Sequence, residues 1–121
     1  MADTETRHTQ IKICGVTTAQ TYQHCADLGV DWIGFVFFEK SPRHLGYDRA
    51  AELADTAAAH APKRVALTVN ADDAMLKNIM TAARPEMIQL HGHETVDRAQ
   101  HIQQTFGVKV MPVITVSSEA D

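Results

Sequence analysis

The stretch Ile11-Lys12-Ile13-Cys14-Gly15 has the pattern of a short apolar strand that ends in a cysteine and then turns through a glycine toward a helix. In parallel α/β folds, ligands bind at the carboxyl ends of the strands, where the last side chain of a strand reaches the site. A thiol at that place is well positioned for chemistry. Cys14 is therefore the first candidate site residue.

The same alternation of an apolar run and a helical pattern repeats along the chain, as expected for βα units in a parallel sheet. Thr18 and Asn70 are predicted to cap the first and third helices, and Gly29 and Gly107 are predicted to end the first and fourth. The predicted strands are 11–14, 32–37, 63–69, 87–90 and 108–114, and the first, second and fourth helices are 18–28, 47–59 and 94–105.

Composition limits the classes of protein to consider. A chain of 121 residues, 45% hydrophobic, forms one domain with a modest core. A net charge of −4 without a run of lysine or arginine gives no reason to expect nucleic acid or an anionic membrane as partner. Two cysteines are too few for a disulfide framework, so we expect a cytoplasmic protein. The polar residues 1–10 are predicted to be a disordered tail, followed by a single domain over 11–121.

Periodicity alone leaves two architectures open. Five parallel strands can form an open, doubly wound sheet of flavodoxin type, for which this length is typical. They can equally be five of the eight strands of a (βα)8 barrel, which usually needs about 250 residues.

Further motifs follow Ile11–Gly15 in a recognisable order: Gly34-Phe35-Val36-Phe37-Phe38 with Lys40-Ser41-Pro42-Arg43, then Val69-Asn70, then Gln89-Leu90-His91-Gly92. Together they resemble the phosphoribosylanthranilate isomerase family of tryptophan biosynthesis, over residues 11–116. The resemblance implies an α/β fold of parallel βα repeats, the amino-terminal five-stranded portion of a TIM barrel. It also implies an Amadori rearrangement of N-(5-phosphoribosyl)anthranilate that needs no cofactor.

The resemblance implies that Cys14 is the general base and that Arg43 binds the anthranilate carboxylate. On chemical grounds, a free cysteine is often only a buried small hydrophobe, as we read Cys25. A strand end facing a helix amino terminus, however, favours the thiolate. Arginine's planar fork can hold a carboxylate through two hydrogen bonds, although a loop arginine is often only solvated.

Gln89 and His91 share one face of the fourth predicted strand, and the resemblance implies that both position the substrate. His93 receives no role, and Asn70 is read first as a helix cap. Cys14, His91 and His93 would suit zinc as nitrogen and sulfur ligands, but no close CxxC or HxxxH pair supports them, so no metal is predicted.

The family's general acid is an aspartate on the sixth strand, and its phosphate site follows strands seven and eight, beyond the resemblance. We therefore expect this polypeptide alone to be inactive, and Asp121 is not taken as the acid. Two alternatives remain: a flavodoxin-like binding or signalling module, and a non-catalytic half-barrel that associates with itself or with a complementary half. The expected ligand is a small molecule.

Overall fold

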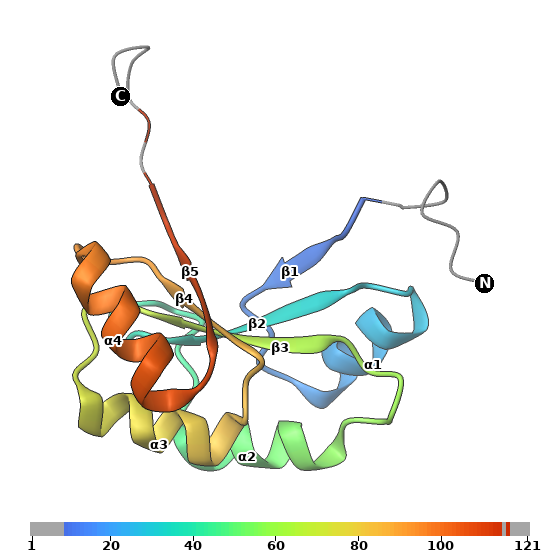
Figure 1. Ribbon diagram of the computed structural model, residues 1–121. Coiled ribbons are helices and arrows are strands. Elements are labelled where there is room, and N and C mark those ends of the chain that lie inside the picture. The colour runs from blue at the N-terminus through green and yellow to red at the C-terminus, as the bar shows by residue number, and fades with distance from the viewer. Residues whose placement is uncertain (1–8, 115, 117–121) are drawn as a thin grey trace.

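The computed structural model describes residues 9–114 and 116, in nine alternating elements (Figure 1). Most of the predicted tail and of the polar carboxyl end lies outside the described residues. In chain order the elements are β1 (Lys12–Cys14), α1 (Ala19–Asp27), β2 (Trp32–Phe37), α2 (Tyr47–Thr56), β3 (Lys63–Thr68), α3 (Asp73–Ala83), β4 (Met87–Leu90), α4 (Val96–Phe106) and β5 (Lys109–Pro112).

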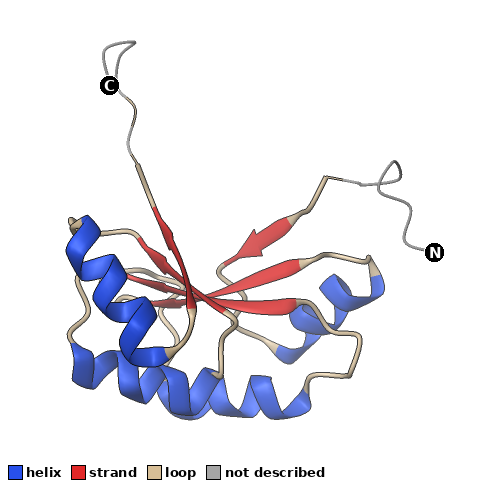
Figure 2. Cartoon of the chain, viewed as in Figure 1, coloured by secondary structure: helices blue, strands red, loops and turns tan. Residues whose placement is uncertain are grey.

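The strands are all parallel, and their order in the sheet is their order in the chain, β1-β2-β3-β4-β5. Every crossover steps in the same direction, and the four helices cover one face of the sheet (Figure 2). A doubly wound sheet would reverse its strand order and carry helices on both faces. The flavodoxin-like alternative is therefore wrong, and the prediction of a TIM-barrel portion is confirmed.

The helix-covered face, called the convex face here, holds the apolar core. Successive side chains of a strand alternate between faces, so Ile33, Phe35 and Phe37 of β2 all point toward the helices. These three side chains are fully buried, and the Phe35 ring meets the Tyr22 ring of α1 edge to face at 6.0 Å between centroids. Burial of this kind is the main stabilising term of the fold.

The opposite, concave face carries the alternate residues of each strand and has no helix over it. Cys14, Gly34 and Val65 occupy one row of this face, and Lys12, Trp32 and Lys63 occupy another. At the amino end of β2, the Trp32 indole donates a hydrogen bond to Gln10 Oε1 at 2.8 Å. The Lys63 ammonium lies 5.2 Å from the centre of the same indole. In a complete barrel this face would be the interior.

Helix boundaries follow the predicted caps in three of four cases. Thr18 caps α1 by accepting the Thr21 N–H at 3.1 Å, and Gly29 and Gly107 follow the ends of α1 and α4 with φ of 74° and 60°. Asn70 is not the cap of α3, because Asp72 accepts the Met75 N–H at 2.8 Å. The predicted cap was therefore wrong by two residues.

Two helices also differ in length from the prediction. The second ends at Thr56 rather than at residue 59. The fourth begins at Val96 with Thr95 as its cap, not at Glu94, whose side chain is used elsewhere. None of the described helices has the length and apolar character to cross a bilayer.

Candidate active site

Cys14 ends β1 on the concave face and is half-buried. Gly34 is its neighbour on β2, and a Cβ at that glycine would lie 3.0 Å from the Cys14 Sγ. The glycine therefore leaves the space that the thiol occupies. Helix α1, which follows Cys14 in the chain, begins at Ala19 and lies on the convex face.

Arg43 reaches back from the β2–α2 loop to the end of β1. Its Nη1 donates a hydrogen bond to the Cys14 carbonyl at 3.1 Å. The side chain crosses so closely over Gly15 that a Cβ there would lie 2.8 Å from the guanidinium carbon. Gly15 also has φ of 84°, so both its backbone angle and its lack of a side chain are required. The structure thus brings Cys14 and Arg43 together.

Arg43 and His91 line one hollow of 320 Å³ at the carboxyl ends of β2, β3 and β4. The other lining residues are mainly apolar: Val36, Phe38, Ser41, Leu67 and Val69. An apolar wall with a few converging polar groups is typical of a small-molecule site. The His91 side chain is exposed. The backbone N–H of His91 donates a hydrogen bond to the Thr68 carbonyl at 2.8 Å, which fixes the backbone that carries the imidazole.

Gln89 lies on the concave face of β4, two residues before His91. Its Oε1 is buried and has no hydrogen-bond partner among the described residues. Leaving a buried acceptor unpaired costs about 1–3 kcal/mol. Gln89 does not itself line the hollow, but its partner on β3, Leu67, does, so a ligand group that reaches deeper into the concave face could donate to this oxygen. Thr68 Oγ1 is also unpaired, but Thr68 points to the convex face and belongs to the core.

The turns after β3 and β4 are joined by a side chain that the sequence analysis missed. Glu94 Oε2 accepts the Asn70 N–H and Oε1 accepts the Gly92 N–H, each at 2.8 Å. Asn70 Oδ1 in turn accepts the His93 N–H at 2.8 Å. Thr95, a good cap immediately before an apolar residue, is the signal that would have placed Glu94 outside the helix and in this turn.

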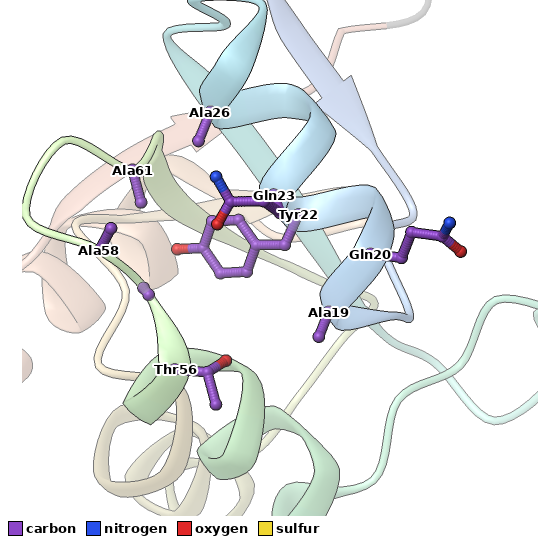
Figure 3. A pocket seen from close by; sticks show the side chains of 9 residues that line it. Ala19, Gln20, Tyr22, Gln23, Ala26, Thr56, Ala58 and Ala61 are labelled. Carbon is purple, nitrogen blue, oxygen red and sulfur yellow. The ribbon is translucent and has the colours of Figure 1, made fainter.

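A second hollow of 320 Å³ lies on the helix side, between α1 and the segment after α2 (Figure 3). Small side chains such as Ala19, Ala26, Ala58 and Ala61 line it, together with Tyr22. It contains none of the candidate residues and offers no charged group. Across residues 9–114, no three His, Cys, Asp or Glu side chains gather as metal ligands, so the zinc alternative gains no support.

Two other titratable groups lie away from this site. Burial raises the pKa of the Cys25 thiol in α1, in keeping with its place in the core. A hydrogen bond from His101, and then one from Arg98, lowers the pKa of the Asp73 carboxyl. These contacts, at 2.9 Å and 2.6 Å, join the start of α3 to α4. Asp73 therefore has a structural function.

The family model described as N-(5'phosphoribosyl)anthranilate (PRA) isomerase matches residues 11–121. The chain belongs to this family. The PRA isomerase of Parvibaculum lavamentivorans is 47% identical over 112 residues, which are 93% of this chain and 52% of the relative. The PRA isomerase of Bradyrhizobium sp. strain BTAi1 is 49% identical over 111 residues, 92% of this chain and 50% of the relative.

Solved PRA isomerase structures have the same arrangement of strands and helices. The Thermotoga maritima enzyme matches with a TM-score of 0.86 and 26% identity, over 93% of this chain and 54% of that one. A PRA isomerase solved with reduced 1-(o-carboxyphenylamino)-1-deoxyribulose 5-phosphate also matches with a TM-score of 0.86 and 26% identity, over 93% of this chain and 57% of that one. The chain thus spans about half the length of the relatives that it matches.

Proposed function

We propose that this chain supplies the general base and the carboxylate clamp of a PRA isomerase, an enzyme of tryptophan biosynthesis that we expect in the cytoplasm. The observation that carries the proposal is the hydrogen bond between Arg43 and the Cys14 carbonyl, which holds the guanidinium against the backbone at the end of β1, where the thiol begins. The hollow lined by Arg43 and His91 gives a small molecule a place to bind. Cys14 is not among the lining residues, and Arg43 is the residue that connects the hollow to the end of β1.

In the proposed reaction, a general acid protonates the furanose ring oxygen, and the bond between that oxygen and sugar C1 breaks. The nitrogen lone pair then forms the C=N bond of a protonated Schiff base, which serves as the electron sink. The Cys14 thiolate removes the proton from sugar C2, and the C–H electrons move toward the imine to form an enolamine. Tautomerisation then gives the aminoketose. Proton transfer of this kind contributes about 10²–10⁴ in rate.

Arg43, His91 and Gln89 are proposed to bind the substrate rather than to transfer protons. One N–H of Arg43 is used by the Cys14 carbonyl, which leaves the other donors of the guanidinium for the anthranilate carboxylate. Gln89 offers a buried oxygen that no described residue bonds, and His91 offers an imidazole in the wall of the hollow. None of these roles requires a cofactor.

We further propose that a polypeptide of these 121 residues turns over little substrate by itself. Among the described residues, none that lines the hollow is an Asp or Glu that could serve as the general acid, which supports the proposal. Loss of acid catalysis alone costs about 10²–10⁴ in rate.

The test mixes this chain with the carboxyl-terminal half of the Parvibaculum lavamentivorans relative and measures turnover of N-(5-phosphoribosyl)anthranilate. We expect activity from the mixture, its loss with Cys14→Ala, and its retention with Cys25→Ala. Cys25 is the matched control, because it is the same residue type buried in the helix-side core. If the mixture turns over substrate at the same rate with Cys14→Ala as with the wild-type chain, the proposal is contradicted.

Self-association is the second proposal, because exposed isoleucine side chains lie in or next to the two edge strands. Ile13 belongs to β1, Ile11 precedes it, and Ile114 follows β5. Unpaired edges with apolar flanks favour pairing with another chain. Sedimentation of this chain alone should show dimers or larger species. Addition of the complementary half should convert these species to a one-to-one complex; a clean monomer would contradict self-association.

A further inference from the structure

The backbone that carries His91 is fixed on both sides. Its own N–H donates to the Thr68 carbonyl of β3, and the next N–H, from Gly92, donates to the Glu94 carboxylate. The second oxygen of that carboxylate accepts the N–H of Asn70, in the neighbouring turn. Glu94 therefore connects Gly92, the residue after His91, to Asn70 in the turn after β3 through two charge-assisted hydrogen bonds.

The geometry around Glu94 leaves little freedom to the two turns. Asn70 has φ of 51°, a left-handed conformation that asparagine tolerates better than most residues. A Cβ at Gly92 would lie 2.7 Å from Asn70 Cγ and 2.9 Å from Asn70 N, so only glycine fits there. The backbone of Gly92 thus lies directly against Asn70, and Glu94 accepts the N–H groups of both residues.

A carboxylate suits this place because both its oxygens are acceptors. A glutamine has one acceptor oxygen, and its NH₂ group would face one of the two N–H donors. An aspartate keeps both oxygens but is one methylene shorter. Conservative substitutions at this position therefore break the connection in two different ways.

We propose that Glu94 is a positioning residue that acts through His91, holding the β4–α4 turn so that the imidazole stands in the wall of the hollow that it shares with Arg43. The expected effect of Glu94 on substrate binding rests on the proposed function. Glu94 lines the adjoining turn and not that hollow, so its effect on the ligand must pass through the backbone of 91–93.

The activity test is a double-mutant cycle in the complemented enzyme. Glu94→Gln should lower kcat/KM about tenfold, mainly through KM, since small misplacements of a binding group are costly. In a His91→Ala background the same change should cost almost nothing further. Equal losses in both backgrounds, or no loss in either, would overturn the proposal. Glu86→Gln, an exposed glutamate before β4 with no described side-chain hydrogen bond, is the control.

A nuclear magnetic resonance measurement on this chain alone separates the inference from the proposed function. Glu94→Gln should shift the amide protons of Asn70 and Gly92 and the ring protons of His91, whereas Glu86→Gln should leave all of them in place. Unchanged His91 ring signals would overturn the positioning role. If Glu94→Gln prevents folding, Glu94→Asp serves in both tests. A wild-type mixture without turnover would instead remove the proposed isomerase.

Discussion

The two faces of this sheet differ in how completely their side chains are buried and hydrogen-bonded. On the convex face, Phe35 of β2 and Ile88 of β4 are completely buried and belong to the same apolar core as Leu76 of α3. On the concave face, Cys14 is only half-buried, and the buried side-chain oxygen of Gln89 finds no hydrogen-bond partner in the part of the chain that the structure describes. The convex face therefore accounts for most of the stability of the fold, whereas the concave face keeps polar groups ready for a ligand at a cost in stability.

The largest expected effect comes from replacing a phenylalanine by alanine on each face, which tests whether the convex face contributes more to stability. Phe35→Ala removes a fully buried ring on the convex face, and we expect the free energy of unfolding to fall by about 3–5 kcal/mol. Phe38→Ala removes a half-buried ring from the hollow and should cost less than half as much. Urea unfolding of the two variants measures both values. Equal losses would show that the faces do not differ in this way.

Gln89→Met tests whether the buried polar group on the concave face lowers the free energy of unfolding. The change removes an unpaired buried oxygen at similar volume, so the free energy of unfolding should rise by about 1 kcal/mol. Affinity of the complemented protein for reduced 1-(o-carboxyphenylamino)-1-deoxyribulose 5-phosphate should fall about tenfold, because a ligand donor loses its acceptor. Calorimetry gives the affinity, and the exposed Gln103→Met is the control. A less stable Gln89→Met variant would mean that the oxygen is bonded after all.

Arg43→Lys tests whether a residue of the concave-face site affects ligand affinity without affecting stability. A lysine keeps the positive charge but lacks the planar fork, so affinity for the same ligand should drop about tenfold. Stability should change by less than about 0.5 kcal/mol, as is usual for exposed positions. Arg49→Lys, in an exposed ion pair with Glu52 on α2, should alter neither quantity. Undiminished affinity in Arg43→Lys would remove the proposed carboxylate clamp.

The smallest effect is a pH dependence of stability on the helix side. Hydrogen bonds from His101 and Arg98 lower the pKa of Asp73. A carboxyl with a depressed pKa in the folded state stabilises the protein above its unfolded pKa of about 3.9, and that contribution is lost as pH falls further. The stability difference between wild type and Asp73→Asn should therefore be steady at pH 5–6 and shrink below about pH 4.

Urea midpoints across that pH range check this prediction, and Asp97→Asn is the matched control. Both aspartates lie in the first turn of a helix, so their interactions with the helix dipole are comparable. Only Asp73 also joins two helices. A similar pH response in both variants would assign the effect to the helix ends alone.

The sequence predicted elements well where a single physical pattern dominates. The apolar runs gave β2 and β4 with their observed bounds, and Thr18 and Gly107 marked helix ends correctly. Strand alternation placed Gln89 on the concave face, and the position at a strand end placed Cys14 there. These inferences need only local periodicity and the rule that the carboxyl ends of parallel strands lie at the same end of the sheet.

The interlocked turns escaped prediction because their cause is not local. Asn70 looked like a helix cap, but its side chain accepts a hydrogen bond from His93, a residue of another turn. Glu94 looked like the first residue of a helix, but its carboxylate serves two backbone groups outside that helix. Such contacts depend on how two loops meet after the sheet has formed, which periodicity does not encode.

The place of the single tryptophan has a practical consequence. Trp32 is half-buried in the uncovered face, near the amino end of the sheet, and it is the chain's sole indole fluorophore. Its emission wavelength depends on how much water surrounds the ring. Titrating the complementary half into this chain should move the emission to shorter wavelength as the barrel closes, so closure can be followed optically without any label.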